Sequence, residues 1–294
     1  MKEVLIISGK GGTGKTTVSA ALADLASKSH ALVLVDADVD AANLELLLEP
    51  THEETFPFRS AHVAVIDQDL CIHCSICEEV CRFDAVRRDE NDTFRIDPSY
   101  CEGCLACLHA CPSDAIQKMQ HQNGEWYRSK TTYGTLFHAN LYPGEENSGK
   151  LVSQIKTDAR EFAEAKDVHF LLIDGPPGIG CPVTAACTGA DLAVIVTEPT
   201  MTGFHDMRRV KAVAEHFRIP TQLVINKCDL NLSVQQEMLK YAAEEKMHVA
   251  GMIPYDEAIM HAQAEGKPVT QSLREPYFDL FQDLWLAIEK AIYE

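Results

Sequence analysis

Near both ends of the chain, the pattern of hydrophobic and polar positions predicts strands that alternate with helices. The region between them does not follow this pattern. In the first region, apolar residues predict a buried strand over 4–8 and a second strand over 31–36. A glycine-rich loop over 9–14 and a helix over 15–27 lie between the two strands. A strand, a helix and a strand in this order form a right-handed crossover, which implies a parallel sheet.

The same alternation returns after about residue 150 and continues through the second half of the chain. We therefore expect an α/β fold with a mainly parallel sheet flanked by helices. The expected elements are a helix over 151–165, strands over 170–174 and 192–197, a helix over 204–217, a strand over 221–226, a helix over 233–246, a strand over 249–253 and a helix over 277–292.

The last of these helices carries an apolar stripe at helical spacing. Its opposite face bears Asp279, Asp283 and Glu289 with only Lys290 as a basic residue, which is unsuited to an anionic lipid surface. Core packing is therefore favoured over membrane binding. The stripe consists of Phe278, Phe281, Leu284, Trp285, Ile288 and Ile292.

A cysteine-rich region, residues 61–122, separates the two alternating regions and repeats itself at an offset of 30 residues. The sequence of residues 66–71 matches that of residues 96–101, and residues 84–86 match residues 114–116. An internal duplication predicts two equivalent half-units that share one small core. We expect a discontinuous α/β domain over 1–60 and 123–294, with a small α+β module inserted over 61–122.

Composition and charge narrow the classes of function. The 294 residues include 46% hydrophobic residues, an ordinary globular content, and 44 acidic against 26 basic residues give a net charge of −18. An acidic surface repels nucleic acid and anionic membranes, so neither is expected as a partner. No apolar run approaches the roughly 18 residues of a membrane span, and the chain opens on a strand without an export leader. We expect a cytoplasmic protein without stable membrane insertion.

A phosphate-binding loop is the first chemical motif. Residues 9–16, Gly-Lys-Gly-Gly-Thr-Gly-Lys-Thr, match G-x-x-x-x-G-K-[ST] directly after a strand and at the start of a helix. Backbone N–H groups and the helix dipole favour bound phosphates at such a loop. Lys15 is expected to reach the β and γ phosphates, and the Thr16 hydroxyl to bind Mg²⁺.

The additional lysine of this loop, Lys10, resembles the deviant Walker A signature of the MinD/ParA/Mrp superfamily, which includes the nitrogenase iron protein. The resemblance implies a dimer in which Lys10 reaches the nucleotide of the partner. Asp36-Ala37-Asp38 resembles switch I of that family, in which Asp38 would position the attacking water. A carboxylate at the carboxyl end of a strand is suited to this role. The nucleotide-binding residues implied by the loop are Gly11, Gly12, Thr13, Gly14, Lys15, Thr16 and Thr17.

Two further segments resemble motifs of the same superfamily. Residues 171–178 resemble the Walker B and switch II segment, which implies that Asp174 holds Mg²⁺ through water and that Gly178 lies near the γ-phosphate. Residues 226–229, Asn-Lys-Cys-Asp, resemble the base-recognition loop, in which Asn226 would contact adenine. The N-K-x-D form also occurs in GTPases, but the Lys10 signature favours ATP.

The cysteines form a second chemical motif. Eight of the eleven lie in two runs, residues 71–81 and 101–111, with the spacing C-x2-C-x2-C-x3-C of bacterial ferredoxins. This run binds two [4Fe–4S] clusters, with the fourth cysteine of each run crossing to the other cluster. Zinc is the alternative, since paired C-x2-C spacings bind it too, but the duplicated run is more specific to iron–sulfur. The implied ligand sets are Cys71, Cys74, Cys77 and Cys111 for one cluster, and Cys101, Cys104, Cys107 and Cys81 for the other.

The resemblance then covers nearly the whole chain, as a MinD-type ATPase with an inserted two-cluster ferredoxin domain. Its first implication is a homodimer, or a heterodimer with a related ATPase, that couples ATP hydrolysis to electron transfer with a redox partner. The alternatives are a carrier that delivers a cluster or metal to a client protein, and a redox-sensing switch of MinD type. Cys181 could bind a further cluster shared across a dimer, but a buried structural role is favoured.

Overall fold

The computed structural model describes residues 1–272 and 277–293. The chain divides into two compact units. The α/β unit comprises Met1–Phe56, Glu125–Leu141 and Ser148–Glu294. The cysteine unit comprises Pro57–Gly124 and Tyr142–Asn147.

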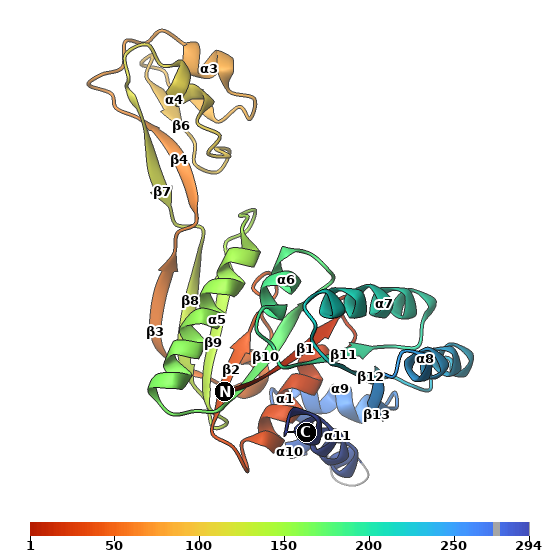
Figure 1. Ribbon diagram of the computed structural model, residues 1–294. Helices are drawn as coiled ribbons and strands as arrows, with labels where there is room; N and C mark the ends of the chain where they lie inside the picture. The colour runs from red at the N-terminus through yellow and green to blue at the C-terminus, as the bar shows by residue number, and fades with distance from the viewer. Residues whose placement is uncertain (273–276, 294) are drawn as a thin grey trace. The chain divides into compact units, whose positions relative to one another are not determined.

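A nine-stranded sheet forms the centre of the α/β unit, in the order β13-β12-β11-β1-β10-β2-β9-β8-β3 (Figure 1). All printed pairings from β13 through to β9 are parallel, which confirms the mainly parallel sheet that the sequence predicts. The strands are β1 (Lys2–Ser8), β2 (Leu32–Asp36), β3 (Thr51–Phe58), β8 (Gly124–Lys130), β9 (Thr135–Leu141), β10 (Phe170–Pro177), β11 (Leu192–Thr197), β12 (Thr221–Asn226) and β13 (His248–Ile253).

Helices cover both faces of this sheet. Helices α1 and α11 pack on one face, and α5, α6 and α7 lie against the other (Figure 1). Successive strand residues point to opposite faces, so Val4 and Ile6 of β1 join the core beneath α1 and α11. The helices are α1 (Lys15–Ala26), α2 (Glu45–Leu48), α5 (Ser148–Ala165), α6 (Cys181–Cys187), α7 (Met201–His216), α8 (Leu232–Glu244), α9 (Glu257–Ala264), α10 (Val269–Ser272) and α11 (Tyr277–Tyr293).

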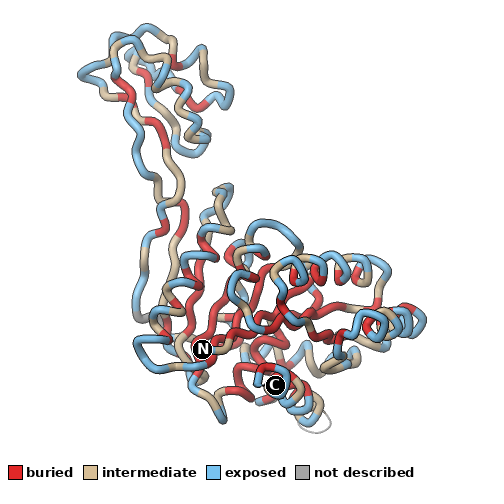
Figure 2. The backbone as a smooth tube through the Cα atoms, in the orientation of Figure 1, coloured by how far each residue is buried: buried red, intermediate tan, exposed pale blue. Residues whose placement is uncertain are grey.

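The central strands are buried along most of their length (Figure 2). The apolar stripe of α11 is also in this core, as its spacing predicts: all its members are buried except Phe278, which is half-buried against the same cluster. Across the described residues, no helix combines the length and apolarity that a membrane crossing requires.

Three strands at one edge of the sheet, β3, β8 and β9, were not predicted from the sequence pattern. The segments that form β3 and β8, THEETFPF and GEWYRSK, mix charged and aromatic residues without a buried apolar run. Strand β3 is the edge strand and β8 is its neighbour, so both lie away from the buried centre of the sheet, and an edge strand tolerates polar and charged residues. Helix α7 also begins three residues earlier than expected, since the Thr200 hydroxyl accepts a hydrogen bond from the Gly203 N–H at 2.9 Å and caps it.

The cysteine unit contains the two equivalent halves that its duplication predicts. Helices α3 (Ile76–Val80) and α4 (Ala106–Ala110) lie 30 residues apart in sequence, and each follows a residue with positive φ. Strand β4 (Ala61–Ile66) pairs antiparallel with β7 (Ile116–His121), and β5 (Val86–Arg88) with β6 (Phe94–Ile96). The shared core consists of Ala64, Ile66, Cys77, Val86, Phe94 and Ile116.

Candidate functional site

The phosphate loop connects the end of β1 to the start of α1. Gly14, immediately before the helix, has φ +89°, and a Cβ there would lie 2.2 Å from the Asn226 Nδ2. Backbone strain therefore favours glycine at this position, and any side chain there would also displace the Asn226 amide. Asn226, at the end of β12, donates a hydrogen bond to the Thr13 carbonyl at 2.8 Å. The structure thus brings the predicted base-recognition loop against the phosphate loop.

Asp174 of β10 lies beneath the same loop and accepts hydrogen bonds from three side chains. The Lys15 ammonium donates at 2.9 Å, the Thr16 hydroxyl at 2.8 Å and the Ser19 hydroxyl at 2.7 Å. The sequence motifs did not indicate Ser19, which lies one helical turn after Lys15. The adjacent oxygens of Asp174 and Thr16 are the hard ligands that Mg²⁺ prefers.

The two aspartates of the predicted switch I segment have different surroundings. Asp36 is fully buried and accepts backbone hydrogen bonds from Asp38, Asn43 and Leu44 at 3.0–3.1 Å, which fixes the loop after β2. Asp38 lies closer to the cavity, with its Oδ2 3.9 Å from the Lys15 Nζ. Asp36 therefore organises the backbone, and Asp38 is the carboxylate that can face a bound phosphate.

Burial is the main cause of the pKa shifts in this group. It raises the pKa of Asp36 to about 7, with a further increase from Asp174 and an opposing effect of Lys15. It raises the pKa of Asp38 to about 6, again opposed by Lys15. Burial alone would lower the pKa of Lys15, but the surrounding carboxylates, Asp174 first, raise it above its ordinary value. Lys15 is therefore a fixed positive charge at the loop.

A cavity of about 1100 Å³ opens over these residues, large enough for a nucleotide. The loop from Gly11 to Thr17 lines it together with Asp38 and Asn226. The Thr13 hydroxyl is buried and, among the described residues, has no hydrogen-bond partner. A buried hydroxyl of this kind indicates a missing polar contact, as a bound phosphate would supply.

Three of the predicted site residues do not line this cavity: Asp174, which lies beneath the loop, Lys10 and Gly178. Lys10 forms an ion pair with Glu198, at the carboxyl end of β11, and Lys227 lies 3.3 Å from the other oxygen of the same carboxylate. The Gly178 N–H donates to the Ser8 carbonyl at 2.9 Å, which ties the segment after β10 to the end of β1. Neither Lys10 nor Gly178 is directed at the nucleotide cavity of its own chain.

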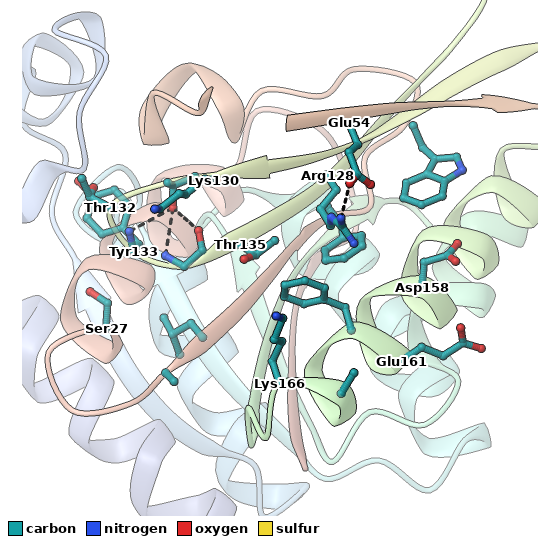
Figure 3. Close-up of a pocket in the computed structure, with 18 of the residues that line it drawn as sticks. Ser27, Glu54, Arg128, Lys130, Thr132, Tyr133, Thr135, Asp158, Glu161 and Lys166 are labelled. Carbon is teal, nitrogen blue, oxygen red and sulfur yellow. Dashed lines mark hydrogen bonds and ion pairs between the residues drawn. The ribbon is translucent and has the colours of Figure 1, made fainter. Parts of the chain in front are cut away.

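A second cavity of about 1180 Å³ lies in the α/β unit, between α5 and the β8–β9 turn (Figure 3). Within it, Arg128 forms an ion pair with Glu54 at 2.6 Å and its guanidinium lies 5.2 Å from the centre of the Phe162 ring. None of the predicted site residues lines it, and its Arg128 is already paired with Glu54. The two cavities have similar volumes, so we identify the candidate site from its residues. It is the cavity over the phosphate loop, which the predicted nucleotide-binding residues line.

The eight cysteines of the two runs surround two small, largely apolar cavities in the cysteine unit. All eight are free thiols. Within the part of the chain that the structure describes, no three His, Cys, Asp or Glu side chains converge closely enough to hold a single metal ion. The first cysteine cavity is lined by Cys71, Cys74, Cys77 and Cys111, and the second cysteine cavity by Cys81, Cys101, Cys104 and Cys107.

This division matches the two crossed ligand sets expected from the spacing. Each cavity takes three thiols from one run and the last thiol of the other. Thiolates are the protein ligands of iron–sulfur clusters, and four of them around one apolar cavity fit the donor set of such a group. The agreement with this donor set concerns the grouping of four cysteine side chains around each cavity.

The three remaining cysteines lie in the α/β unit. Cys181, expected to be buried, is exposed at the start of α6, so that expectation is wrong. It is the first residue of α6, whereas the buried residues of this helix are Val183, Ala186 and Cys187. Cys187 at the other end of α6 is buried, and burial raises the pKa of its thiol to about 11 despite the nearby Lys156. Cys228 is half-buried in the base loop.

Comparison with known proteins places this geometry among nucleotide-binding proteins. The profile of the CobQ/CobB/MinD/ParA nucleotide-binding domain matches residues 4–269. An uncharacterised protein of Methanocaldococcus jannaschii is 36% identical over 78% of this chain and 79% of its own length. A second one from the same organism is 28% identical over 91% of this chain and 92% of its own length. The septum site-determining protein MinD of Pyrococcus horikoshii, solved with Mg-ADP, superposes with a TM-score of 0.61 at 18% identity, covering 98% of this chain and 96% of that one.

Proposed function

Because the chain belongs to the CobQ/CobB/MinD/ParA nucleotide-binding family, we propose that it is a Mg²⁺-dependent ATPase that acts as a dimeric switch of MinD type. We propose further that its cysteine unit is an inserted ferredoxin-like module that makes the switch respond to redox state. The observation that carries the first part is that Lys15 and Thr16 line one nucleotide-sized cavity and both donate hydrogen bonds to Asp174 beneath it.

Each residue of this group has a role that its position supports. Lys15 neutralises the β and γ phosphates, and Thr16 and Asp174 orient Mg²⁺, the second of them through a water molecule. Asp38 positions the attacking water from the end of β2. The buried Asp36 holds the switch loop in place through its three backbone hydrogen bonds.

The base and the dimer complete this proposal. Asn226 lies against the phosphate loop, where its amide can contact adenine beside the aromatic Tyr255, which also lines the cavity. Lys10 is not directed at its own cavity, which agrees with a role on the nucleotide of a partner subunit. That partner is a second copy of this chain or a related ATPase. The second arrangement is supported by Methanocaldococcus jannaschii, which has two different proteins similar to this chain.

The redox part of the proposal rests on the two cysteine cavities. Each of them brings together the four thiols that the ferredoxin spacing assigns to one cluster. Bound [4Fe–4S] clusters would supply one-electron chemistry. The cysteines hold them, and the small apolar core around Phe94 and Ile116 limits access of water.

The test compares purified, anaerobic protein in the oxidised and the dithionite-reduced state. Iron and sulfide are counted, and the ATPase rate and the dimer fraction are measured with and without Mg-ATP. We expect about eight irons per chain, an ATP-dependent dimer, and an ATPase rate that differs between the two redox states. Equal rates and dimer fractions in both states would contradict the redox link, and two zinc ions with no iron would contradict the clusters.

A matched pair of lysines makes the nucleotide part specific. Lys15→Ala should abolish ATP binding, because the buried charge at the phosphates is lost. Lys150 ends a second G-x-x-x-x-G-K stretch, residues 144–150, but lies in the first turn of α5. Lys150→Ala should therefore bind ATP normally, and a loss of binding in that variant would contradict the assignment of the loop.

ATP-driven electron transfer is the second candidate function. It is favoured by the presence of two four-thiol cavities in one small unit, since two clusters can form a path for an electron. In this case the reduced protein should pass electrons to a one-electron acceptor only while ATP is hydrolysed, and Lys15→Ala should stop the transfer. A switch would instead change its ATPase rate on reduction without transfer that depends on hydrolysis.

A further inference from the structure

The two halves of the cysteine unit carry different side chains at equivalent positions beside their cavities. The 30-residue repeat pairs Ser113 with Phe83, each two residues after the last cysteine of its run. Ser113 lines the first cysteine cavity and Phe83 lines the second. The two sets of thiols are equivalent, but their surroundings are not.

Ser113 contacts a thiol of the first set. Its hydroxyl lies 3.6 Å from the Cys111 Sγ, within hydrogen-bond distance for sulfur. A hydroxyl donates to a thiolate, which can only accept. The Phe83 side chain has no donor to offer Cys81, so no hydroxyl donates to the crossing cysteine of the second set from this position.

A second pair of equivalent residues differs in charge. Glu102 lines the second cysteine cavity, whereas its counterpart, Ile72, lines the first. A third pair adds to the contrast, since Ser75 lines the first cavity and its counterpart Leu105 the second. The first cavity therefore has two hydroxyl groups and no carboxylate, while the second has a carboxylate and no hydroxyl among its lining residues.

We infer that the first cysteine site takes up the first electron that enters the cysteine unit, and that Ser113 and Glu102 set this order. The inference rests on the iron–sulfur occupancy proposed above. Hydrogen bonds to sulfur and local charge set the reduction potential of such a group. An added electron makes the site more negative, so the Ser113 hydroxyl stabilises the reduced state of the first site. The Glu102 carboxylate opposes the reduced state of the second.

The step is a simple one-electron reduction. One electron passes from a low-potential one-electron donor to the group held at the first site, and the donor is oxidised by one electron. No bond to the protein forms or breaks, and no proton is transferred. Ser113 and Glu102 are positioning residues in this step, since they change the energy of the electron without carrying it.

Other charges near the cysteines act in the opposite direction. Glu78 and Glu79 follow Cys77 on α3, and Arg82 follows Cys81. All three side chains are exposed, and none of them lines either cavity. Glu102 is exposed as well, but unlike these three it lines a cavity and so lies nearer to the thiols. Screening by water and salt weakens the more distant charges most, so the lining residues decide the order.

The test is a redox titration of the anaerobic, iron-loaded protein with dithionite, followed by EPR. We expect two reduction steps in the wild-type protein. Ser113→Ala should lower the higher midpoint potential only, reducing the preference of the electron for that site about tenfold, which is about 59 mV for one electron. Glu102→Gln should raise the lower midpoint potential only. Ser99→Ala removes an exposed serine that lines neither cavity, and it should change neither potential.

The outcomes separate this inference from the function on which it rests. A protein without bound iron would contradict both. An iron-loaded protein in which Ser113→Ala moves the lower potential, or neither potential, would overturn only the inference. Phe83→Ser provides an independent measurement if Ser113→Ala loads poorly. It adds a hydroxyl beside Cys81 and should raise the lower potential alone.

Discussion

Lys10 and Glu198 form an ion pair between the phosphate loop and the end of β11, 188 residues apart in sequence. Glu198 also lies 3.3 Å from the Lys227 ammonium, so one carboxylate holds two lysines beside the nucleotide cavity. Burial opposes the charged form of Glu198, but both lysines outweigh it and hold the pKa of this carboxyl below its ordinary value. In the proposed dimer, Lys10 would have to leave this pair to reach the nucleotide of the partner subunit.

The first prediction is that Glu198→Gln increases ATP-dependent dimerisation. The neutral amide releases Lys10, and the loss of a partly exposed pair of about 1 kcal/mol corresponds to about fivefold in the dimerisation constant. Light scattering against ATP concentration measures it. Glu244→Gln, which removes an exposed charge 3.9 Å from Lys240, is the control and should dimerise as the wild type does. Weaker dimerisation of Glu198→Gln would show that Glu198 supports the dimer instead.

The second prediction concerns the pH dependence of ATP hydrolysis. Ionised Asp38 is a stronger hydrogen-bond acceptor for the attacking water than the protonated carboxyl, and its pKa is raised to about 6, mainly by burial. Below this pH the carboxyl is protonated, so kcat/KM should fall about tenfold for each pH unit. The position of this acid limb is measured from initial rates between about pH 5 and 8, a range that includes the raised pKa of Asp38.

Asp40→Asn tests whether this limb belongs to Asp38. The Asp40 charge contributes to the raised pKa of Asp38, so its removal should move the limb to lower pH. The phosphates of ATP also titrate in this range, but the substitution does not change them. An acid limb at the same pH in both proteins would assign it to the nucleotide and contradict the prediction.

The third prediction uses two glycines of the phosphate loop. A Cβ at Gly9 would lie 2.4 Å from the Asp206 Cβ and 2.6 Å from its backbone carbon, whereas a Cβ at Gly11 would meet nothing within 4 Å. Gly9→Ala should therefore destabilise the nucleotide-free protein by about 1–3 kcal/mol through overpacking against α7. Gly11→Ala should change the free energy of unfolding little. Denaturant unfolding of both variants measures the difference, and equal stability would show that the loop and α7 can separate without cost.

The parts of the site that the sequence predicted are those at which one residue type follows a strand in a fixed motif. Asp38 lies just beyond β2, Asn226 ends β12 and Asp174 lies in the second half of β10, and the carboxyl ends of these strands meet at one edge of the sheet. Lys15 begins α1 after the loop that follows β1. The sequence did not predict the contacts of Ser19 and Glu198. Their contacts depend on the helix and the sheet being packed, and no local spacing marks a serine within a helix or a carboxylate 188 residues from its lysine.

The same distinction holds for the fold. The buried strands β1, β10 and β11 are continuous apolar runs, so their pattern predicts them. Strand β3 is the edge of the sheet and β8 lies beside it, where pairing with a neighbour rather than burial of an apolar run defines the strand. The pattern of the cysteine unit was informative because its two halves repeat. The residues that differ between the halves make the linings of the two cysteine cavities different.

The last prediction concerns α11, whose stripe the sequence assigned to the core. Leu284 is fully buried, and its Cδ1 lies 3.4 Å from the position that a Cβ on Gly251 of β13 would take. Leu284→Ala should cost about 2–5 kcal/mol, because the cavity cannot collapse against a packed strand. Leu286 on the same helix is 50% exposed, so Leu286→Ala is the matched control and should change stability by less than about 0.5 kcal/mol. Denaturant unfolding of the two variants measures both values, and a larger loss for Leu286→Ala would mean that the helix presents its other face to the sheet.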